Sequence, residues 1–218
     1  ACDLGLLHFP YTLELIVLKA QILGELERAE EAMELIENSI LLFPSDTDLR
    51  IVKGSLLSQM KQHEAAIEQF LNVLESTEEK DEVYFRIGLC YLNWPKPREA
   101  VDMFKKALEH NPENESALVE LANALDEIGK IEESIPYYKQ FIDIDPFSFT
   151  AWYNLGIAYS KLKQYEKAID AYEYSLAIEP TFGSSLFNLG NTFMNLNEYA
   201  KAEEAYRLCL QHDDPNPE

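Results

Sequence analysis

Cysteine, histidine and carboxylate side chains are the groups in this 218-residue chain that could bind a metal ion or catalyse a reaction. The three cysteines, Cys2, Cys90 and Cys209, form no CxxC pair, and the four histidines are scattered without an HExxH pattern. Metal sites need several such ligands at short, fixed spacings. We therefore expect no metal ion and no other cofactor.

The sequence also lacks the motifs that activate a nucleophile or hold a phosphate group. It contains neither a GxSxG nucleophile elbow nor a glycine-rich phosphate loop. Its 39 carboxylates place some pairs at catalytic-looking separations by chance, so their number indicates no chemistry. The sequence predicts a protein that is not an enzyme.

The charge balance restricts the partners that the chain could bind. Acidic residues outnumber basic ones by 39 to 18, and the formal net charge is −21. This field repels phosphate backbones and anionic lipids and favours basic or neutral partners, although solvated acidic helix faces give the same composition. No apolar run approaches the roughly 18–20 residues that span a bilayer. We therefore expect a protein that binds neither nucleic acid nor membranes. An odd number of widely spaced cysteines is typical of reduced thiols, so we expect the protein to be cytoplasmic.

An internal repeat of 34 residues organises the chain. Residues 154–168 read NLGIAYSKLKQYEKA, and residues 188–202 read NLGNTFMNLNEYAKA. The same frame continues backwards without insertion or deletion and gives six units: 13–46, 47–80, 81–114, 115–148, 149–182 and 183–216. A period of this length is typical of stacked repeat proteins.

Two columns of small residues and two columns of large residues recur in these units. The eighth position is always alanine or glycine: Ala20, Gly54, Gly88, Ala122, Gly156 and Gly190. Twelve residues later the chain has Ala32, Ala66, Ala100, Ser134, Ala168 and Ala202. Large residues follow three positions after the first column (Leu23, Leu57, Tyr91, Leu125, Tyr159, Phe193) and four after the second (Ile36, Phe70, Phe104, Tyr138, Tyr172, Tyr206). Spacings of three and four share a helical face, so the columns predict a close antiparallel helix pair.

Prolines and capping residues separate the predicted helix pairs. Pro44, Pro112, Pro146 and Pro180 share one position of the frame, and proline cannot continue a helix. Asp46, Asn114 and Ser148 follow two residues later, where a side chain caps the next helix. The sequence therefore predicts an all-α protein built from helix–turn–helix units.

These positions resemble the tetratricopeptide repeat (TPR). In unit 149–182 the pattern is carried by Trp152, Leu155, Gly156, Tyr159, Ala168, Tyr172 and Pro180. The first two units depart from it, because Lys19 and Lys53 replace a leucine and Arg50 replaces the opening aromatic residue. The resemblance implies a right-handed α-solenoid superhelix of helix–turn–helix repeats, with residues 13–218 forming one solenoid.

The resemblance also implies where a partner binds. In this family the first helix of each repeat lines a concave face that binds peptides or helices. The positions that this implies here are Val17, Gln21, Ile51, Ser55, Phe85, Leu89, Val119, Asn123, Tyr153, Asn154, Ile157, Phe187, Asn188 and Asn191. Aromatic anchors and adaptable amides are common in peptide grooves. The alternative for each residue is that it only packs against a neighbouring repeat.

Two binding modes known in the family can be compared with these positions. One clamps a partner's terminal carboxylate with inward lysine and arginine side chains, but here Arg86 stands alone beside Glu82 and the groove is acidic, so we reject it. The other grips a peptide backbone with a ladder of asparagines. The ladder position reads Leu18, Val52, Arg86, Glu120, Asn154 and Asn188. Two asparagines of six are a fragment of such a ladder, and if a peptide backbone is gripped anywhere, the last two units are the place.

These observations predict a non-catalytic protein–protein interaction scaffold that binds a basic or apolar peptide or helix in the concave groove. The alternative is a regulatory or substrate-recruiting TPR arm of a larger enzyme or signalling protein. The two differ in whether chemistry resides in sequence outside this chain.

The repeat frame also leads to an expectation for the two ends. Run backwards, it places Cys2 in the aromatic position and Pro10 in the proline position, so residues 1–12 are predicted to be the second half of a truncated preceding helix pair. An ordinary N-terminal helix is the alternative. Solenoids need a polar terminal helix over their last apolar face, and the sequence HDDPNPE after Gln211 offers none. We expect an excised piece of a longer repeat protein that forms end-to-end homodimers through its uncapped terminal helices.

Overall fold

The computed structural model describes residues 13–213, and this part of the chain contains twelve α-helices and no strand. The helices are α2 (Leu13–Glu25), α3 (Ala29–Leu42), α4 (Thr47–Gln59), α5 (His63–Val73), α6 (Lys80–Asn93), α7 (Pro97–His110), α8 (Glu115–Glu127), α9 (Ile131–Ile144), α10 (Phe149–Lys161), α11 (Tyr165–Ile178), α12 (Gly183–Asn195) and α13 (Tyr199–Asp213). The predicted all-α class is confirmed. The partial helix predicted for residues 1–12 and the last residues of unit 183–216 lie outside the described part.

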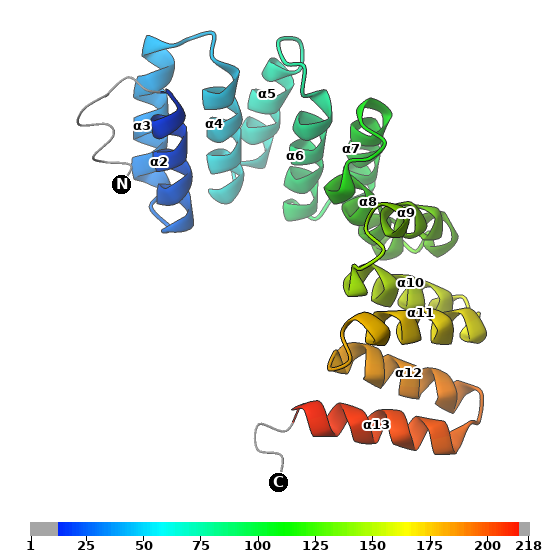
Figure 1. Cartoon of the computed structure of the whole chain (residues 1–218). Helices are drawn as coiled ribbons and strands as arrows, with labels where there is room; N and C mark the ends of the chain where they lie inside the picture. Colours follow the sequence, from blue (N-terminus) through cyan, green and yellow to red (C-terminus); the bar gives the residue numbers. More distant parts are fainter. Residues whose placement is uncertain (1–12, 214–218) are drawn as a thin grey trace. The chain divides into compact units, whose positions relative to one another are not determined.

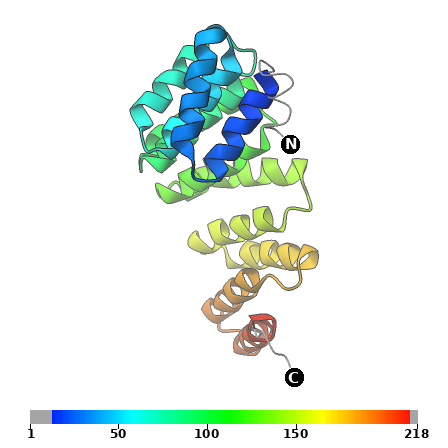
Figure 2. The same ribbon diagram turned by 90° about the vertical axis from the view of Figure 1, so that its left-hand side faces the viewer.

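The chain divides between Pro112 and Glu113 into two compact units. Unit 1 contains α2 to α7, and unit 2 contains α8 to α13. Within each unit the helices pack in chain order, each against the next (Figure 1), and Figure 2 shows the same stacking after a quarter turn. A single continuous solenoid over residues 13–218 stays a prediction.

Three of the first helices begin at the predicted capping residues. The side chains of Asp46, Asn114 and Ser148 each accept a hydrogen bond from the backbone N–H three residues later, at 2.9, 2.9 and 3.4 Å. These bonds satisfy backbone donors that the first turn of a helix leaves free. The caps therefore set where α4, α8 and α10 start.

The turn inside five helix pairs of the described chain contains one residue with a positive φ angle. These residues share one position of the 34-residue frame: Glu27, Lys61, Gly129, Lys163 and Asn197. Gly129 has a φ of 79°, a conformation that glycine adopts without steric cost. The pair α6–α7 has Pro95 at this position, and its ring holds φ negative, so this turn follows another path.

The glycines of the first small column make room for an aromatic ring of the second helix. A Cβ atom added at Gly156 would lie 2.5 Å from Cε1 of Tyr172, and one added at Gly54 would lie 2.8 Å from Cε1 of Phe70. The rings of Tyr172 and Phe70 are fully buried. We call such a glycine and the ring that it faces a ring socket. The glycines of the first small column therefore face the second large column, whose residues lie four positions after the second small column.

The sockets decide which side of each first helix stays accessible. In α10, Ala151, Leu155 and Ala158 are buried in the core, whereas Tyr153 and Asn154 are only half-buried. Since a helix repeats every 3.6 residues, these two groups lie on different faces. The predicted binding residues thus lie along the edge of the core.

Replacing Gly156 with alanine tests the ring socket. The added methyl group would overlap the Tyr172 ring, so we expect Gly156→Ala to lower the free energy of unfolding by about 1–3 kcal/mol, as overpacking does. Urea titration followed by far-ultraviolet circular dichroism measures the change.

Gly24→Ala is the matched control, because a Cβ atom there would lie 2.9 Å from Oε1 of Gln59, the end of a flexible side chain. The higher helix propensity of alanine should leave this variant unchanged or stabilise it by up to about 1 kcal/mol. Equal urea midpoints for the two variants would contradict the socket.

Candidate peptide-binding sites

Three surface cavities lie along the first helices that carry the predicted binding residues. One is in unit 1, formed by α2, α4 and α6, and two are in unit 2, along α8, α10 and α12. We name them the Arg86 cavity, the Asn154 cavity and the Phe187 cavity after a residue that lines each.

The Arg86 cavity has a volume of about 440 Å³ and brings together three predicted residues, Gln21, Ile51 and Ser55. Arg86 donates to Oγ of Ser55 at 3.2 Å, and its guanidinium lies 2.7 Å from the carboxylate of Glu82. The Nε atom of Arg86 is buried and has no hydrogen-bond partner among residues 13–213. Arg86 therefore bridges α4 and α6, and Glu82 neutralises its charge.

The remaining predicted residues of unit 1 do not line this cavity. Val17 packs against the core cluster of α2, α3 and α4, and the ring of Phe85 is tilted against Phe104 with their centres 5.7 Å apart. Leu89 is half-buried. Val17 thus packs in a cluster that includes the neighbouring repeat, which was the alternative for each predicted residue, whereas Phe85 packs within its own repeat.

The Asn154 cavity has a volume of about 300 Å³ and lies where α8, α9 and α10 meet. It brings together three predicted residues, Asn123, Asn154 and Ile157. The amide oxygen of Asn123 accepts a hydrogen bond from the hydroxyl of Tyr138 at 2.8 Å. The amide of Asn154 bonds to no residue within the described chain, so it has both a donor and an acceptor for a ligand.

Carboxylates make the surroundings of the Asn154 cavity acidic. Asp126 and Glu127 line it, and the only cation in its lining, Lys161, lies 3.4 Å from Asp126. Burial raises the pKa of Glu120. Burial also raises the pKa of Tyr138, and the charges of Asp126 and Glu120 raise it further. These carboxylates therefore act on the same small region, which would attract a positively charged group.

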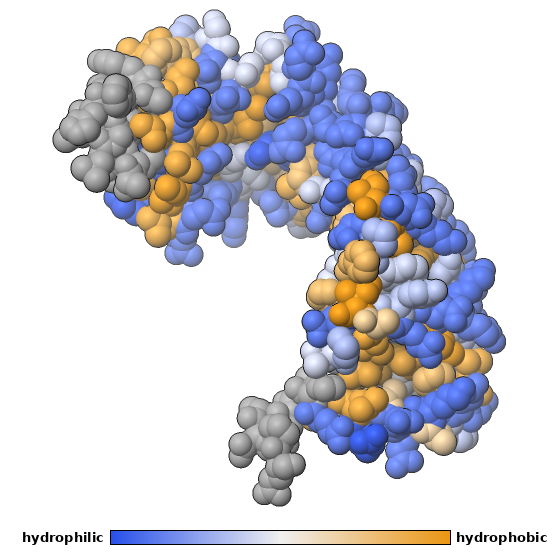
Figure 3. Space-filling model, in the orientation of Figure 1, coloured by the Kyte–Doolittle hydropathy of each residue, from blue (hydrophilic) through white to orange (hydrophobic). Residues whose placement is uncertain are grey.

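The Phe187 cavity has a volume of about 400 Å³ and lies where α10 and α12 begin. Phe187 is 53% exposed, and apolar surface is visible over the beginnings of these helices (Figure 3). Tyr153 is held in place, because its hydroxyl accepts from Asn188 at 3.2 Å and its ring meets the Phe182 ring edge-on at 5.0 Å. The second amide hydrogen of Asn188 goes to the carbonyl oxygen of Ser184 at 3.0 Å. The ring of Phe187 is tilted against that of Tyr206 with their centres 6.0 Å apart, yet half of its surface stays exposed, so Phe187 is the accessible apolar group and Tyr153 forms a wall.

Two predicted residues of unit 2, Val119 and Asn191, line neither cavity. Val119 is half-buried. The amide oxygen of Asn191 accepts from the hydroxyl of Tyr206 at 2.8 Å, as that of Asn123 does from Tyr138. Asn191 thus repeats a core-to-surface bond without a cavity beside it.

Sequence reasoning missed two residues that shape these cavities. Tyr138 was placed in the large column of the second helices, yet its hydroxyl end reaches the Asn154 cavity. Phe182 precedes α12 in a turn, where helical periodicity carries no information. Its place two residues after Pro180, where Ser148 caps α10, was the available signal.

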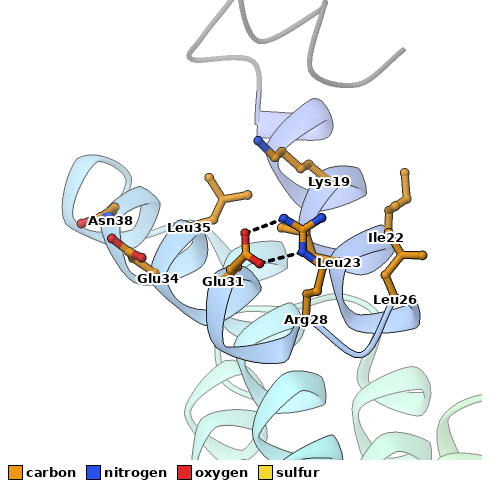
Figure 4. Close-up of a pocket in the computed structure, with 9 residues that line it drawn as sticks. All are labelled: Lys19, Ile22, Leu23, Leu26, Arg28, Glu31, Glu34, Leu35 and Asn38. Carbon is orange, nitrogen blue, oxygen red and sulfur yellow. Dashed lines mark hydrogen bonds and ion pairs between the residues drawn. The ribbon is translucent and has the colours of Figure 1, made fainter.

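A fourth cavity, of about 410 Å³, lies on the pair α2–α3 and contains none of the predicted binding residues. Figure 4 shows Lys19 and Ile22 of α2, and Leu26 directly after this helix, on one side of it, with the Arg28–Glu31 ion pair of 2.6 Å beside them. Both charged side chains of that pair are exposed.

The described part of the chain holds no group of three or more histidine, cysteine or acidic side chains that could bind a metal ion. None of its helices combines the length and apolar composition needed to cross a bilayer.

Comparison with known families settles which repeat this is. Models of the tetratricopeptide repeat match residues 47–80, 96–155, 149–182 and 183–216. The chain belongs to the tetratricopeptide repeat family. The resemblance inferred from unit 149–182 is thereby confirmed. The comparison with curated proteins found no match to this chain.

Solved TPR structures share the fold. A structure of MamA from Desulfovibrio magneticus RS-1 is 20% identical, covers 77% of this chain and 94% of its own, and has a TM-score of 0.71. A crystal structure of MamA is 22% identical, with coverages of 73% and 94% and a TM-score of 0.69. YrrB, described as a TPR protein with an unusual peptide-binding site, is 19% identical, with coverages of 85% and 96% and a TM-score of 0.63. At these identities the likeness concerns the fold alone.

The half-buried carboxyl group of Glu120 gives a test of the electrostatics around the Asn154 cavity. Burial raises its pKa, so the charged form is less stable in the folded state than in the unfolded state. At neutral pH the charged carboxylate therefore lowers the free energy of unfolding. The effect disappears when the pH falls below about 4.3, the pKa of a glutamate in the unfolded chain. Glu120→Gln should therefore raise the urea midpoint at pH ~7 and leave it unchanged at pH ~3.

Glu173→Gln is the control for that experiment, since Glu173 is exposed in the middle of α11. It should leave the midpoint unchanged at both pH values. A Glu120→Gln variant that is no more stable than wild type at neutral pH would mean that the carboxylate is solvated.

Proposed function

We propose that this TPR protein is a non-catalytic interaction scaffold, and that unit 2 binds an extended peptide or helix of a partner protein. The partner places a basic side chain in the Asn154 cavity and an apolar side chain in the Phe187 cavity. The carrying observation is that neighbouring residues of α10, Asn154 and Tyr153, line these two cavities. One segment lying across α10 can therefore occupy both.

The chemistry of the Asn154 cavity favours a basic side chain. Its carboxylates, Asp126 and Glu127, face a single cation, Lys161, and the whole chain carries a net charge of −21. Complementary charge steers encounter and sets specificity. The amide of Asn154 can at the same time bond the backbone of the bound segment, because peptide grooves use such adaptable polar groups.

The chemistry of the Phe187 cavity favours an apolar side chain. A few residues usually carry most of the binding energy of an interface, and an exposed phenylalanine in a preformed hollow is a residue of this kind. Tyr153 and Phe182 hold the hollow open through their edge-to-face contact. Membership of the TPR family, and the peptide-binding site named for YrrB, support a peptide as the ligand.

Phe187→Ala tests this proposal. Peptides selected from a random library for binding to the wild-type chain should be enriched in one basic and one apolar residue. Loss of the Phe187 ring should weaken them about tenfold or more, as truncation of an interface anchor does. Fluorescence polarisation of the labelled peptides measures the affinities.

Phe147→Ala is the matched control, because Phe147 is also an exposed phenylalanine of unit 2 but lies in the turn before α10, outside both cavities. It should leave the affinities unchanged. Selected peptides that bind equally well to wild type and Phe187→Ala would rule out this site. Tyr153→Ala is a poorer test, since it also removes core contacts.

We propose in addition that copies of the chain associate head to tail through the open faces of α2 and α13. Ile22 of α2 is 43% exposed, whereas Leu56, which shares its position in the repeat frame, is 2% exposed against the preceding pair. Leu210 of α13 is 71% exposed, whereas its counterpart Ile142 is 7% exposed. Apolar surface gathers over α2 and α3, beside the cavity on that pair (Figures 3 and 4).

Leu210→Glu tests the head-to-tail contact. A contact between two different faces does not close on itself, so the average mass of the wild-type protein should rise steadily with concentration in sedimentation velocity experiments. A carboxylate in the apolar contact should prevent this rise. Gln211→Glu, which adds the same charge to the neighbouring residue, should not. A wild-type chain that stays monomeric at millimolar concentration would contradict the proposal.

A further inference from the structure

A cavity of about 370 Å³ lies between α9 and α11 with α10 beneath it. We call it the outer groove. It shares no lining residue with the Asn154 or Phe187 cavity. The α10 residues that line it are Trp152, Leu155 and Tyr159, which lie about half a helical turn away from Tyr153 and Ile157. The outer groove is therefore a separate surface of unit 2.

Aromatic rings form a fixed apolar floor and wall in the outer groove. The indole of Trp152 stacks on the ring of Tyr174 with their centres 4.6 Å apart and an angle of 22° between them. The indole N–H donates to the carbonyl oxygen of Pro146 at 3.0 Å, so its polar atom is already paired. The faces left open are apolar and preorganised, which reduces the entropy lost when a ligand binds.

Charges of opposite sign lie at the two ends of the outer groove. The ammonium groups of Lys139 on α9 and Lys167 on α11 lie 5.9 and 5.5 Å from the centre of the Tyr159 ring. Asp143 and Asp170 follow about one turn later on the same two helices. Both ammonium groups approach the Tyr159 ring, which marks the lysine end of the outer groove. Since α9 and α11 both pack against α10, and each runs from its lysine to its aspartate toward its C-terminus, we infer that the aspartates mark the other end. Within residues 13–213, neither aspartate forms an ion pair.

We propose that the outer groove binds a segment of a partner protein that inserts one aromatic or large aliphatic side chain between Trp152, Tyr159 and Tyr174. The segment carries an acidic residue on one side of that side chain and a basic residue on the other. The acidic residue meets the lysine end, and the basic residue meets the aspartate end, where the Trp152 and Tyr174 rings add a cation–π attraction.

This charge pattern argues against other occupants. A segment with charges of one sign gains at one end of the outer groove and is repelled at the other. A nucleic acid would meet Asp143 and Asp170 and the negative field of the whole chain. A purely apolar segment would offer no opposite charge to any of the four charged groups.

Four blocked nine-residue peptides in a glycine–serine frame serve as probes. Their central residues are Glu-Phe-Lys, Lys-Phe-Lys, Glu-Phe-Glu and Glu-Ala-Lys. The readout is the indole N–H resonance of Trp152 in proton–nitrogen NMR spectra, with Trp94 of unit 1 as the internal reference. Glu-Phe-Lys should bind about three- to fivefold more tightly than Lys-Phe-Lys or Glu-Phe-Glu, the range expected for an exposed charge pair. Glu-Ala-Lys should not bind.

A double variant, Lys139→Glu with Lys167→Glu, makes the sharper test because both side chains are exposed. It should reverse the preference, so that Lys-Phe-Lys binds more tightly than Glu-Phe-Lys. Phe187→Ala should leave all four affinities unchanged, which separates the outer groove from the peptide site of the other face. Probes that leave the Trp152 resonance unmoved at millimolar concentration, or that bind regardless of charge, would overturn the proposal.

Discussion

The ring socket is the packing constraint on which the remaining structure of each unit depends. Without a Cβ atom at the eighth position, the ring of the second helix can lie directly on the backbone of the first, as Tyr172 does on Gly156. The close approach fixes the rotation of both helices about their axes. That rotation decides which residues of α10 enter the core and which remain at its edge. Burial of the rings of Phe70, Phe104, Tyr138 and Tyr172 in four of the pairs also contributes much of the apolar area that stabilises stacked repeats.

The same rings connect the core to the candidate binding surface. In unit 2 each socketed or equivalent tyrosine carries its hydroxyl to a polar side chain of the first helix: Tyr138 to Asn123, Tyr172 to Ser160 and Tyr206 to Asn191. Burial raises the pKa of Tyr172 to about 12, so its hydroxyl stays protonated at neutral pH. Because Tyr138 and Tyr206 donate to the amide oxygens, the amide N–H groups of Asn123 and Asn191 are turned away from the core. A core contact thus orients a surface donor.

Features with a local cause could be predicted from the sequence. The capping bond of Asn114 needs only residues three apart, and the small and large columns need only the 3.6-residue period of a helix. The family resemblance implied Asn123, Asn154 and Ile157 as binding positions, and the structure brings them into one cavity. It could not separate Phe187, which is 53% exposed, from Phe85, which is half-buried, although both rings are tilted against a ring of the second helix. Periodicity gives the direction of a side chain but not how much of it the neighbouring side chains cover. The outer groove depends on charged residues of α9 and α11, such as Lys139 and Lys167, which are 28 residues apart in the sequence. These residues come close together only because both helices pack against α10.

Helix α10 is the element that the two candidate surfaces of unit 2 have in common. One face carries Asn154 and Ile157, and the other carries Trp152 and Tyr159. The helix is held against α11 by two contacts, the Gly156–Tyr172 socket and the Trp152–Tyr174 stack. A ligand on either face therefore meets side chains that are already positioned, and neither has to move α10 in order to bind. Sites that share a rigid element and need no conformational change have little free energy of coupling, since coupling requires a ligand to favour one arrangement over another. If both proposed surfaces bind, two partners would occupy unit 2 together without competing, which is the property that distinguishes a scaffold from a switch.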